Sequence, residues 1–175
     1  MKTEDIKNYH VTETLRDGRT MIIRAVRPED KGLVVEGLKD VSPESIYRRF
    51  FTMKKGITPQ GLKLVTEVDF ENVVALVTVL EKDGNAQITG GGRYARTAKK
   101  RAEVAFLIAD PFQGLGIASL LIKHLAGIAR DSGITEFEAE VLSSNKAMLR
   151  VFARSGFSIT KAVMHETIHV VMKLD

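Results

Sequence analysis

Two stretches of this sequence combine residue types and spacings that could support chemistry. The first, HETIH at residues 165–169, matches the H-E-x-x-H signature of zinc peptidases. That signature binds zinc on a helix, where residues four positions apart are neighbours. The surrounding residues, MHETIHVVMKL, are rich in Thr, Ile and Val and indicate a final β-strand instead. Along a strand His165 and His169 would lie about 13 Å apart, so we predict no metal site.

The second stretch is DPFQGLGIAS, residues 110–119, in which a strand-like segment leads through glycines into a helix-like segment. The N–H groups of a helix's first turn have no partners within the helix and lie at the positive end of its dipole. They form a site for anions such as phosphates. Gly114 and Gly116 allow close approach because they lack a Cβ. The sequence therefore predicts a phosphate-binding turn.

Two common phosphate-binding motifs do not fit this turn. It lacks the Gly-Lys-Ser/Thr ending of a P-loop. GLGIAS also approaches a dinucleotide-binding fingerprint, with Ser119 in place of the third glycine and Glu138 and Glu140 at about the distance of its acidic residue. That fingerprint follows the first strand of a repeated βαβ fold, whereas several strand-like segments come first here. We exclude both motifs.

Hydrophobic periodicity and turn residues predict the elements that position the turn. The expected strands cover residues 9–15, 20–26, 72–80, 86–96, 102–109 and 135–142, followed by a final strand pair. The expected helices begin at Pro28, Ser42 and Thr58, or cover residues 115–131 and 144–156. This order predicts one α+β domain over residues 1–175, with a mixed sheet and an N-terminal hairpin at about 9–26.

Local features give finer expectations. Ser42 is the expected N-cap of the second helix, and that helix is expected to bury Ile46, Phe50 and Phe51. The three glycines at 90–92 lie inside a predicted strand and indicate a bulge or a close approach of another backbone.

Composition limits the class of protein. The 175 residues carry a formal net charge of +4, and 44% are hydrophobic, as in soluble globular proteins. The absence of cysteine excludes disulfides, thiolate metal sites and a cysteine acyl-enzyme. The longest aliphatic run, residues 73–80, is far too short to span a membrane. Only 6% of residues are aromatic, which argues against nucleic-acid binding. We expect a cytoplasmic protein with no membrane or nucleic-acid partner.

The motifs, taken in chain order, resemble the GNAT family of N-acetyltransferases. The family motif Q/R-x-x-G-x-G/A is followed further along by Asn and Gly-Phe. The matching residues are Gln113, Gly116, Ala118, Asn145, Gly156 and Phe157. The resemblance covers roughly residues 20–174, and SPESIYRRFF (42–51) is most similar to the acetyltransferase domain of Pat-type bacterial protein lysine acetyltransferases.

The resemblance implies a GNAT-like fold: a mixed, mostly antiparallel central sheet with helices on both faces and one splayed strand pair. It implies acetyl-CoA as co-substrate, with the pyrophosphate held by backbone amides of the turn and the pantetheine arm paired with the edge of strand 102–109. The Phe106 N–H would polarise the thioester carbonyl. The implied CoA-binding residues are Phe106, Ile108, Gln113, Gly114, Leu115, Gly116, Ile117, Ala118, Ser119 and Asn145.

The resemblance also implies a general base. Glu103 lies on the strand before the turn, where many GNAT proteins carry that base, and its neighbours Val104, Phe106 and Ile108 could desolvate its carboxylate.

One residue departs from the family pattern. Phe152 stands where many members have a tyrosine that protonates the departing thiolate. Water, Tyr47 or Tyr94 could supply that proton, or CoA could leave without an acid.

These observations favour an acetyl-CoA-dependent N-acetyltransferase acting directly on an amine, which could be a protein lysine. The alternatives are a small-molecule amine acetyltransferase and a non-catalytic module that binds or senses acyl-CoA. We expect the acceptor pocket to be built from helices and loops at about residues 28–60, and the C-terminal edge strand could mediate a homodimer. The sequence does not identify the acceptor.

Overall fold

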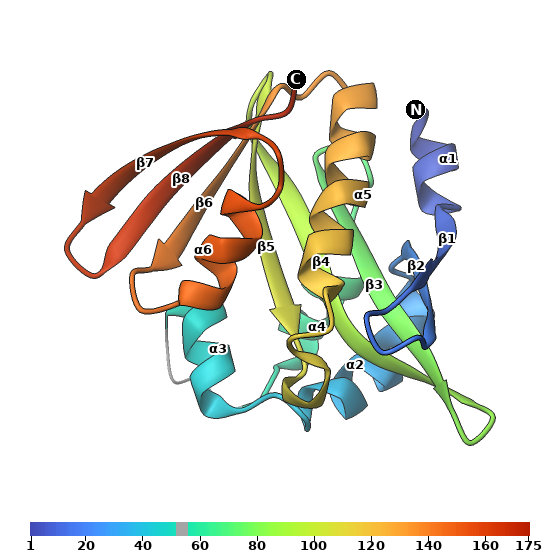
Figure 1. The fold of residues 1–175 in the computed structure, drawn as a ribbon. Helices are drawn as coiled ribbons and strands as arrows, with labels where there is room; N and C mark the ends of the chain where they lie inside the picture. Colours follow the sequence, from blue (N-terminus) through green and yellow to red (C-terminus); the bar gives the residue numbers. More distant parts are fainter. Residues whose placement is uncertain (52–55) are drawn as a thin grey trace.

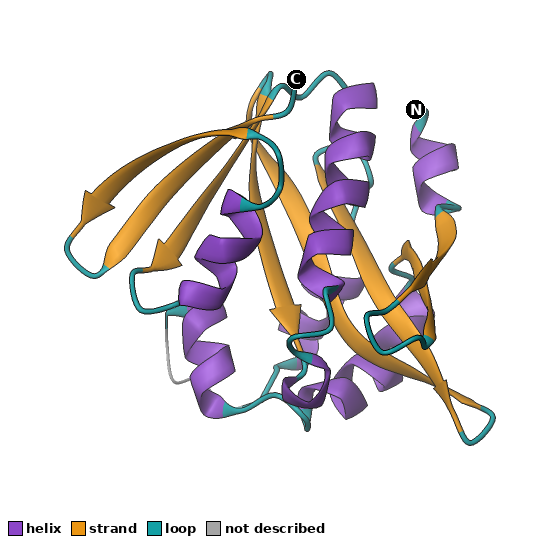
Figure 2. Cartoon of the chain, viewed as in Figure 1, coloured by secondary structure: helices purple, strands orange, loops and turns teal. Residues whose placement is uncertain are grey.

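The computed structural model describes residues 1–51 and 56–175. Within these residues the chain forms one eight-stranded sheet flanked by six α-helices (Figures 1 and 2). The strands are β1 (His10–Thr14), β2 (Thr20–Ala25), β3 (Val73–Lys82), β4 (Asn85–Ala98), β5 (Arg101–Ile108), β6 (Glu136–Leu142), β7 (Ser158–Met164) and β8 (Thr167–Lys173).

The helices lie on both sides of the sheet, with α5 and α6 in front and α2 and α4 behind in the view of Figure 1. The α-helices are α1 (Thr3–Lys7), α2 (Lys31–Leu38), α3 (Pro43–Phe50), α4 (Pro59–Thr66), α5 (Ile117–Asp131) and α6 (Lys146–Ala153). Two short 3₁₀ turns, η1 (Pro28–Asp30) and η2 (Asp110–Phe112), precede α2 and α5. No helix in the described part of the chain is long and apolar enough to cross a membrane.

The strand order is β1-β2-β3-β4-β5-β6-β8-β7, and the described neighbours are antiparallel except for β5 and β6. These two run parallel and pair only where Arg101–Glu103 faces Glu136–Glu138. Beyond this pairing the two strands diverge into a V (Figure 1). The mixed α+β fold with one splayed strand pair is therefore confirmed.

The core lies between the sheet and α5. Leu121 and Leu125 of α5 are fully buried, as is Phe137 of β6. Gly92 permits this packing, because a Cβ there would lie 2.7 Å from the Phe106 ring. A register shift opposite Thr78 and Val79 adds a bulge beside the first glycine of the three. The bulge lies at Thr89, one residue before the glycines, and the close backbone approach is at Gly90, where a Cβ would lie 2.9 Å from the Leu107 carbonyl oxygen.

Most local signals gave the correct element. The N-terminal hairpin forms, and the hydroxyls of Ser42 and Thr58 cap α3 and α4 by accepting from the N–H groups of Ser45 and Gly61. Helix α1 was not expected from the sequence.

The expected burial on α3 is wrong for two residues. Phe50 and Phe51 are exposed, at 46% and 41%, and the buried residue of this helix is Ser45. Helical spacing identified a face of α3, but α3 turns its polar start toward the rest of the protein.

The HETIH stretch lies on a β-hairpin. His165 has a φ of 55° and stands in the turn between β7 and β8, rather than in the strand expected for it, whereas His169 is in β8. Within residues 1–51 and 56–175 no three metal-ligating side chains come together. The helix that the zinc signature requires is absent from this stretch.

Candidate functional site

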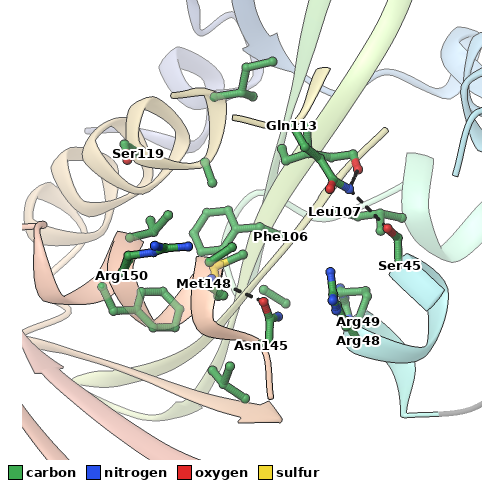
Figure 3. Close-up of a pocket in the computed structure, with 18 of the residues that line it drawn as sticks. Ser45, Arg48, Arg49, Phe106, Leu107, Gln113, Ser119, Asn145, Met148 and Arg150 are labelled. Carbon is green, nitrogen blue, oxygen red and sulfur yellow. Dashed lines mark hydrogen bonds between the residues drawn. The ribbon is translucent and has the colours of Figure 1, made fainter. Parts of the chain in front are cut away.

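The V between β5 and β6 opens into a cavity of about 340 Å³ (Figure 3). Its walls come from β5, β6, the turn before α5, and helices α3, α5 and α6. Nine of the residues expected at a CoA site line it: Phe106, Ile108, Gln113, Gly114, Gly116, Ile117, Ala118, Ser119 and Asn145. The structure therefore brings most of the residues selected by motif into one cavity.

The N-terminus of α5 forms one end of this cavity. Gly114 and Gly116 have φ values of 80° and 87°, a region that glycine adopts without strain. Gly116 is the N-cap, and no side chain caps the helix. Leu120 is the first residue whose N–H bonds to the start of the helix, at the Gly116 carbonyl. The N–H groups before it are available to an anion.

Arginines line several walls of this cavity. Arg16, from the turn of the N-terminal hairpin, donates to the Gly114 carbonyl at 3.4 Å. Among the described residues that line the cavity, the other guanidinium groups belong to Arg48, Arg49, Arg150 and Arg154, and the one carboxylate is that of Glu140. No sequence motif identified these arginines. The net charge of +4 was the one sequence feature that pointed to an anionic ligand. The excess positive charge favours a polyanionic ligand.

The edge of β5 forms a second wall. The Ala109 N–H donates to the Thr89 carbonyl of β4 at 2.9 Å. Because successive N–H groups point to opposite sides of a strand, the N–H groups of Phe106 and Ile108 point away from β4, toward the open V. These donors have no strand beside them, since β6 pairs with β5 only as far as Glu103. An extended ligand could pair with this edge.

Gln113 joins this edge to α3. Its Nε2 donates to the Ile108 carbonyl at 3.0 Å and to Ser45 Oγ at 3.1 Å (Figure 3). The Gln113 side chain thus occupies the Ile108 carbonyl at the end of β5. The N–H of Ile108 is still available to a ligand.

Asp110 completes the connection to α3. Its Oδ1 accepts from the Ser42 N–H and from the Ser45 hydroxyl, both at 3.0 Å. Burial acts to raise the pKa of Asp110, but the hydrogen bonds from Ser42 and Ser45 outweigh it and hold the pKa below its usual value. The ionised carboxylate of Asp110 therefore holds α3 against the turn that precedes α5.

Helix α6 supplies the opposite wall. Asn145 caps it, with Oδ1 accepting from the Met148 N–H at 3.3 Å (Figure 3). Phe152 is buried, and its ring centre lies 6.3 Å from that of Phe106. Neither Tyr47 nor Tyr94, the tyrosines considered as proton donors, is among the described residues that line the cavity.

Two of the residues expected at the site lie outside the cavity lining. Leu115 contributes its carbonyl to Arg16 N–H at 3.4 Å instead. Glu103 is exposed on the sheet face opposite Phe106, because side chains alternate along β5. The expected desolvation by Val104 and Phe106 is therefore wrong, since both side chains point toward α5.

Part of the segment expected to form the acceptor pocket reaches the cavity. Of residues 28–60, Ser45, Arg48 and Arg49 line it. Residues 52–55 lie outside the described part of the chain.

Comparison with known proteins agrees with this geometry. Residues 41–157 match the profile of the acetyltransferase (GNAT) family. The chain is 31% identical over 153 residues to Acetyltransferase PA5475 of Pseudomonas aeruginosa, an alignment that covers 87% of this chain and 82% of that protein. It superposes on the crystal structure of the GNAT domain of S. lividans PAT with a TM-score of 0.85 and 31% identity, covering 94% of this chain and 96% of that domain.

A further relative is longer than this chain. Acetyltransferase Pat of Mycolicibacterium smegmatis is 33% identical over 144 residues, which are 81% of this chain. The chain spans only 42% of that protein.

Proposed function

Because the chain belongs to the acetyltransferase (GNAT) family, we propose that it transfers an acetyl group from acetyl-CoA directly to an amine, with a protein lysine as the first candidate acceptor. Acetyl-CoA is the acetyl donor of this family. One observation carries the proposal: the V brings an uncapped helix N-terminus and an unpaired strand edge into one cavity. The lysine acceptor rests on the similarity to Pat-type proteins.

The cavity has donors suited to each part of the co-substrate. The N–H groups that begin α5 and the nearby Arg16 would hold the pyrophosphate. The Ile108 N–H would pair with an amide of the pantetheine arm. The Phe106 N–H would donate to the thioester oxygen, and a donor of this kind contributes about 2.7–4 kcal/mol to catalysis elsewhere.

The transfer forms a C–N bond and breaks the C–S bond of the thioester, and CoA leaves as the thiolate. Glu103 would take the proton that the attacking amine loses. Its exposure on the face opposite Phe106 suits an acceptor that approaches from the other side of the sheet. Phe152 cannot protonate the thiolate, so we propose that CoA leaves without an acid from this position.

The test measures CoA release, by a thiol assay, across lysine-bearing proteins, polyamines, amino acids and aminoglycosides. We expect Glu103→Gln to lower kcat by about a hundredfold or more while acetyl-CoA affinity by calorimetry is retained. Glu81→Gln removes an exposed carboxylate at the far end of β3 and should match the wild type. If the chain bound acetyl-CoA tightly but acetylated none of these amines, the enzyme proposal would be wrong. The chain would then be a module that senses acyl-CoA.

A further inference from the structure

Two half-buried arginines stand beside Glu103 on the acceptor side of the sheet. Arg93 of β4 follows Gly92, whose missing Cβ faces α5, so its own side chain lies on the other face, with Glu103. Glu103 pairs with Ala95, two residues from Arg93, which places the two Cα atoms diagonally at about 7–8 Å. Arg49 lies on α3, which packs against β5, and its side chain lines the cavity (Figure 3). The charges of both Arg93 and Glu103 act on its guanidinium group.

The glutamates of β6 on this face already have partners. Glu136 accepts two hydrogen bonds from Arg101, and Glu138 accepts from the Thr97 hydroxyl at 2.8 Å. His169 of the HETIH stretch contacts Glu140 and lies 3.7 Å from Glu138. The glutamates of β6 therefore each have a partner within the sheet.

The two arginines differ from these glutamates. Within residues 1–51 and 56–175, the guanidinium groups of Arg49 and Arg93 make no hydrogen bond or ion pair, although that of Arg49 stacks on the Phe50 ring, 4.6 Å from its centre. Burial lowers the pKa of both, Arg93 lowers the pKa of Arg49 further, and Glu103 acts in the opposite direction on each. A guanidinium stays charged at any ordinary pH. The donors of these half-buried guanidinium groups have no acceptor among the described residues, and a bound anion would supply one.

We infer that Arg49 and Arg93 bind a carboxylate carried by the acceptor, next to Glu103, so that the preferred acceptor is an amine with an adjoining carboxylate. The fork of a guanidinium matches a carboxylate with two parallel hydrogen bonds. Glu103 would then face the amine, and the two arginines would face the carboxylate beside that amine. The carboxylate has two sources: the α-carboxylate of an amino acid, or an acidic side chain beside a lysine. This inference rests on the proposed function.

The experiment compares acceptors in matched pairs, using CoA release by the full chain. One arm sets amino acids against their amides. The other sets single-lysine peptides flanked by Glu against the same peptides flanked by Gln. In one arm we expect the carboxylate-bearing member to have a kcat/KM about ten- to a hundredfold higher, mainly through a lower KM. The arm that shows this preference identifies the source of the carboxylate.

Variants test whether the arginines produce the preference. Arg93→Met and Arg49→Met should each reduce the ratio within the pair, and Arg93→Lys should reduce it partly because a lysine lacks the fork. Retained acetyl-CoA affinity by calorimetry identifies variants that have folded. Lys161→Met removes an exposed positive charge on β7 and should leave the ratio unchanged.

Three outcomes would overturn the inference. These are equal rates within both pairs, a ratio that survives Arg93→Met, and an arginine-dependent preference for succinyl-CoA over acetyl-CoA in place of any acceptor preference. Failure of the proposed function is recognised separately, because then no amine is acetylated at all. That result removes this inference as well.

Discussion

At the scale of single residues, Gly92 is where the sheet packs most closely against α5. An added Cβ would lie 2.7 Å from Phe106 Cδ1 and 3.1 Å from Leu125 Cδ1. Gly92→Ala should therefore lower the free energy of unfolding by about 1–3 kcal/mol, as overpacking does. Gly127→Ala is the control: it lies inside α5 with nothing within 4 Å and should add about 0.5–1 kcal/mol. Urea unfolding measures both, and an unchanged midpoint for Gly92→Ala would contradict the close packing.

The buried pair of Arg24 and Asp30 makes stability depend on pH. Burial acts to raise the pKa of Asp30, but hydrogen bonds from Arg24 and from the Arg27 N–H lower it below its usual value. A lowered carboxyl pKa stabilises the fold above the unfolded-state pKa near 3.8, and that stability is lost as pH falls through the folded-state pKa. Asp30→Asn should cost about 3–5 kcal/mol at pH 7.

The control for this pair is Asp17→Asn. Asp17 pairs with Arg19 on the surface, where the two side chains are 35% and 49% exposed, so its loss should shift the urea midpoint far less than Asp30→Asn does. Urea midpoints at pH 7 and pH 3.5 measure both variants. If Asp30→Asn lost as much stability between these pH values as the wild type, the carboxylate would not be the group that titrates.

The backbone of the site could be predicted from the sequence, whereas most of its side chains could not. Gly114 and Gly116 predict a turn with positive φ, because the need for glycine at such a turn depends only on the local backbone. Arg16, Arg49 and Arg93 come from three separate elements, and nothing in their own neighbourhoods marks them. Arg16 and Arg49 reach the V only through the packing of the N-terminal hairpin and of α3. The register of β4 places Arg93 on the face of Glu103.

At the scale of elements, α3 depends on a few hydrogen bonds for its position. Asp110 binds Ser42 and Ser45 at its start, and Gln113 binds Ser45. Asp110→Ala should release α3, so that the backbone amides of α3 after Pro43 exchange hydrogen faster and the KM for acetyl-CoA rises. Glu44→Gln changes the same helix at a residue whose side chain is 76% exposed and should alter neither. Unchanged exchange in Asp110→Ala would show that other contacts hold α3.

Element prediction succeeded where the signal is local and failed where it depends on packing partners. The cap-and-proline starts of α3 and α4 were correct because a capping hydroxyl acts within one turn. Phe50 and Phe51 were wrongly assigned to the core, since periodicity does not say what covers a face. The zinc signature failed for a related reason, because its spacing has meaning only on a helix.

At the scale of the whole molecule, the sheet has two parts joined at a narrow point. β5 and β6 share three register pairs, and Arg101 adds ion pairs to Glu136 and Glu138 at the same place. The splay was expected from the family resemblance and not from residue patterns, because divergence of two strands is a long-range property. The open V is therefore both the proposed ligand site and the gap between the two parts.

A ligand that fills the V should stabilise both parts of the sheet together. Acetyl-CoA at a hundred times its Kd adds about 2.7 kcal/mol of stability by mass action. For a chain of this size that corresponds to a rise in Tm of about 5–10 °C. Adenosine at the same concentration lacks the pyrophosphate and the pantetheine arm, so it should raise Tm by far less. Differential scanning calorimetry measures both shifts. Equal shifts would mean that the α5 terminus and the β5 edge contribute nothing to binding, because these are the two features that adenosine does not engage.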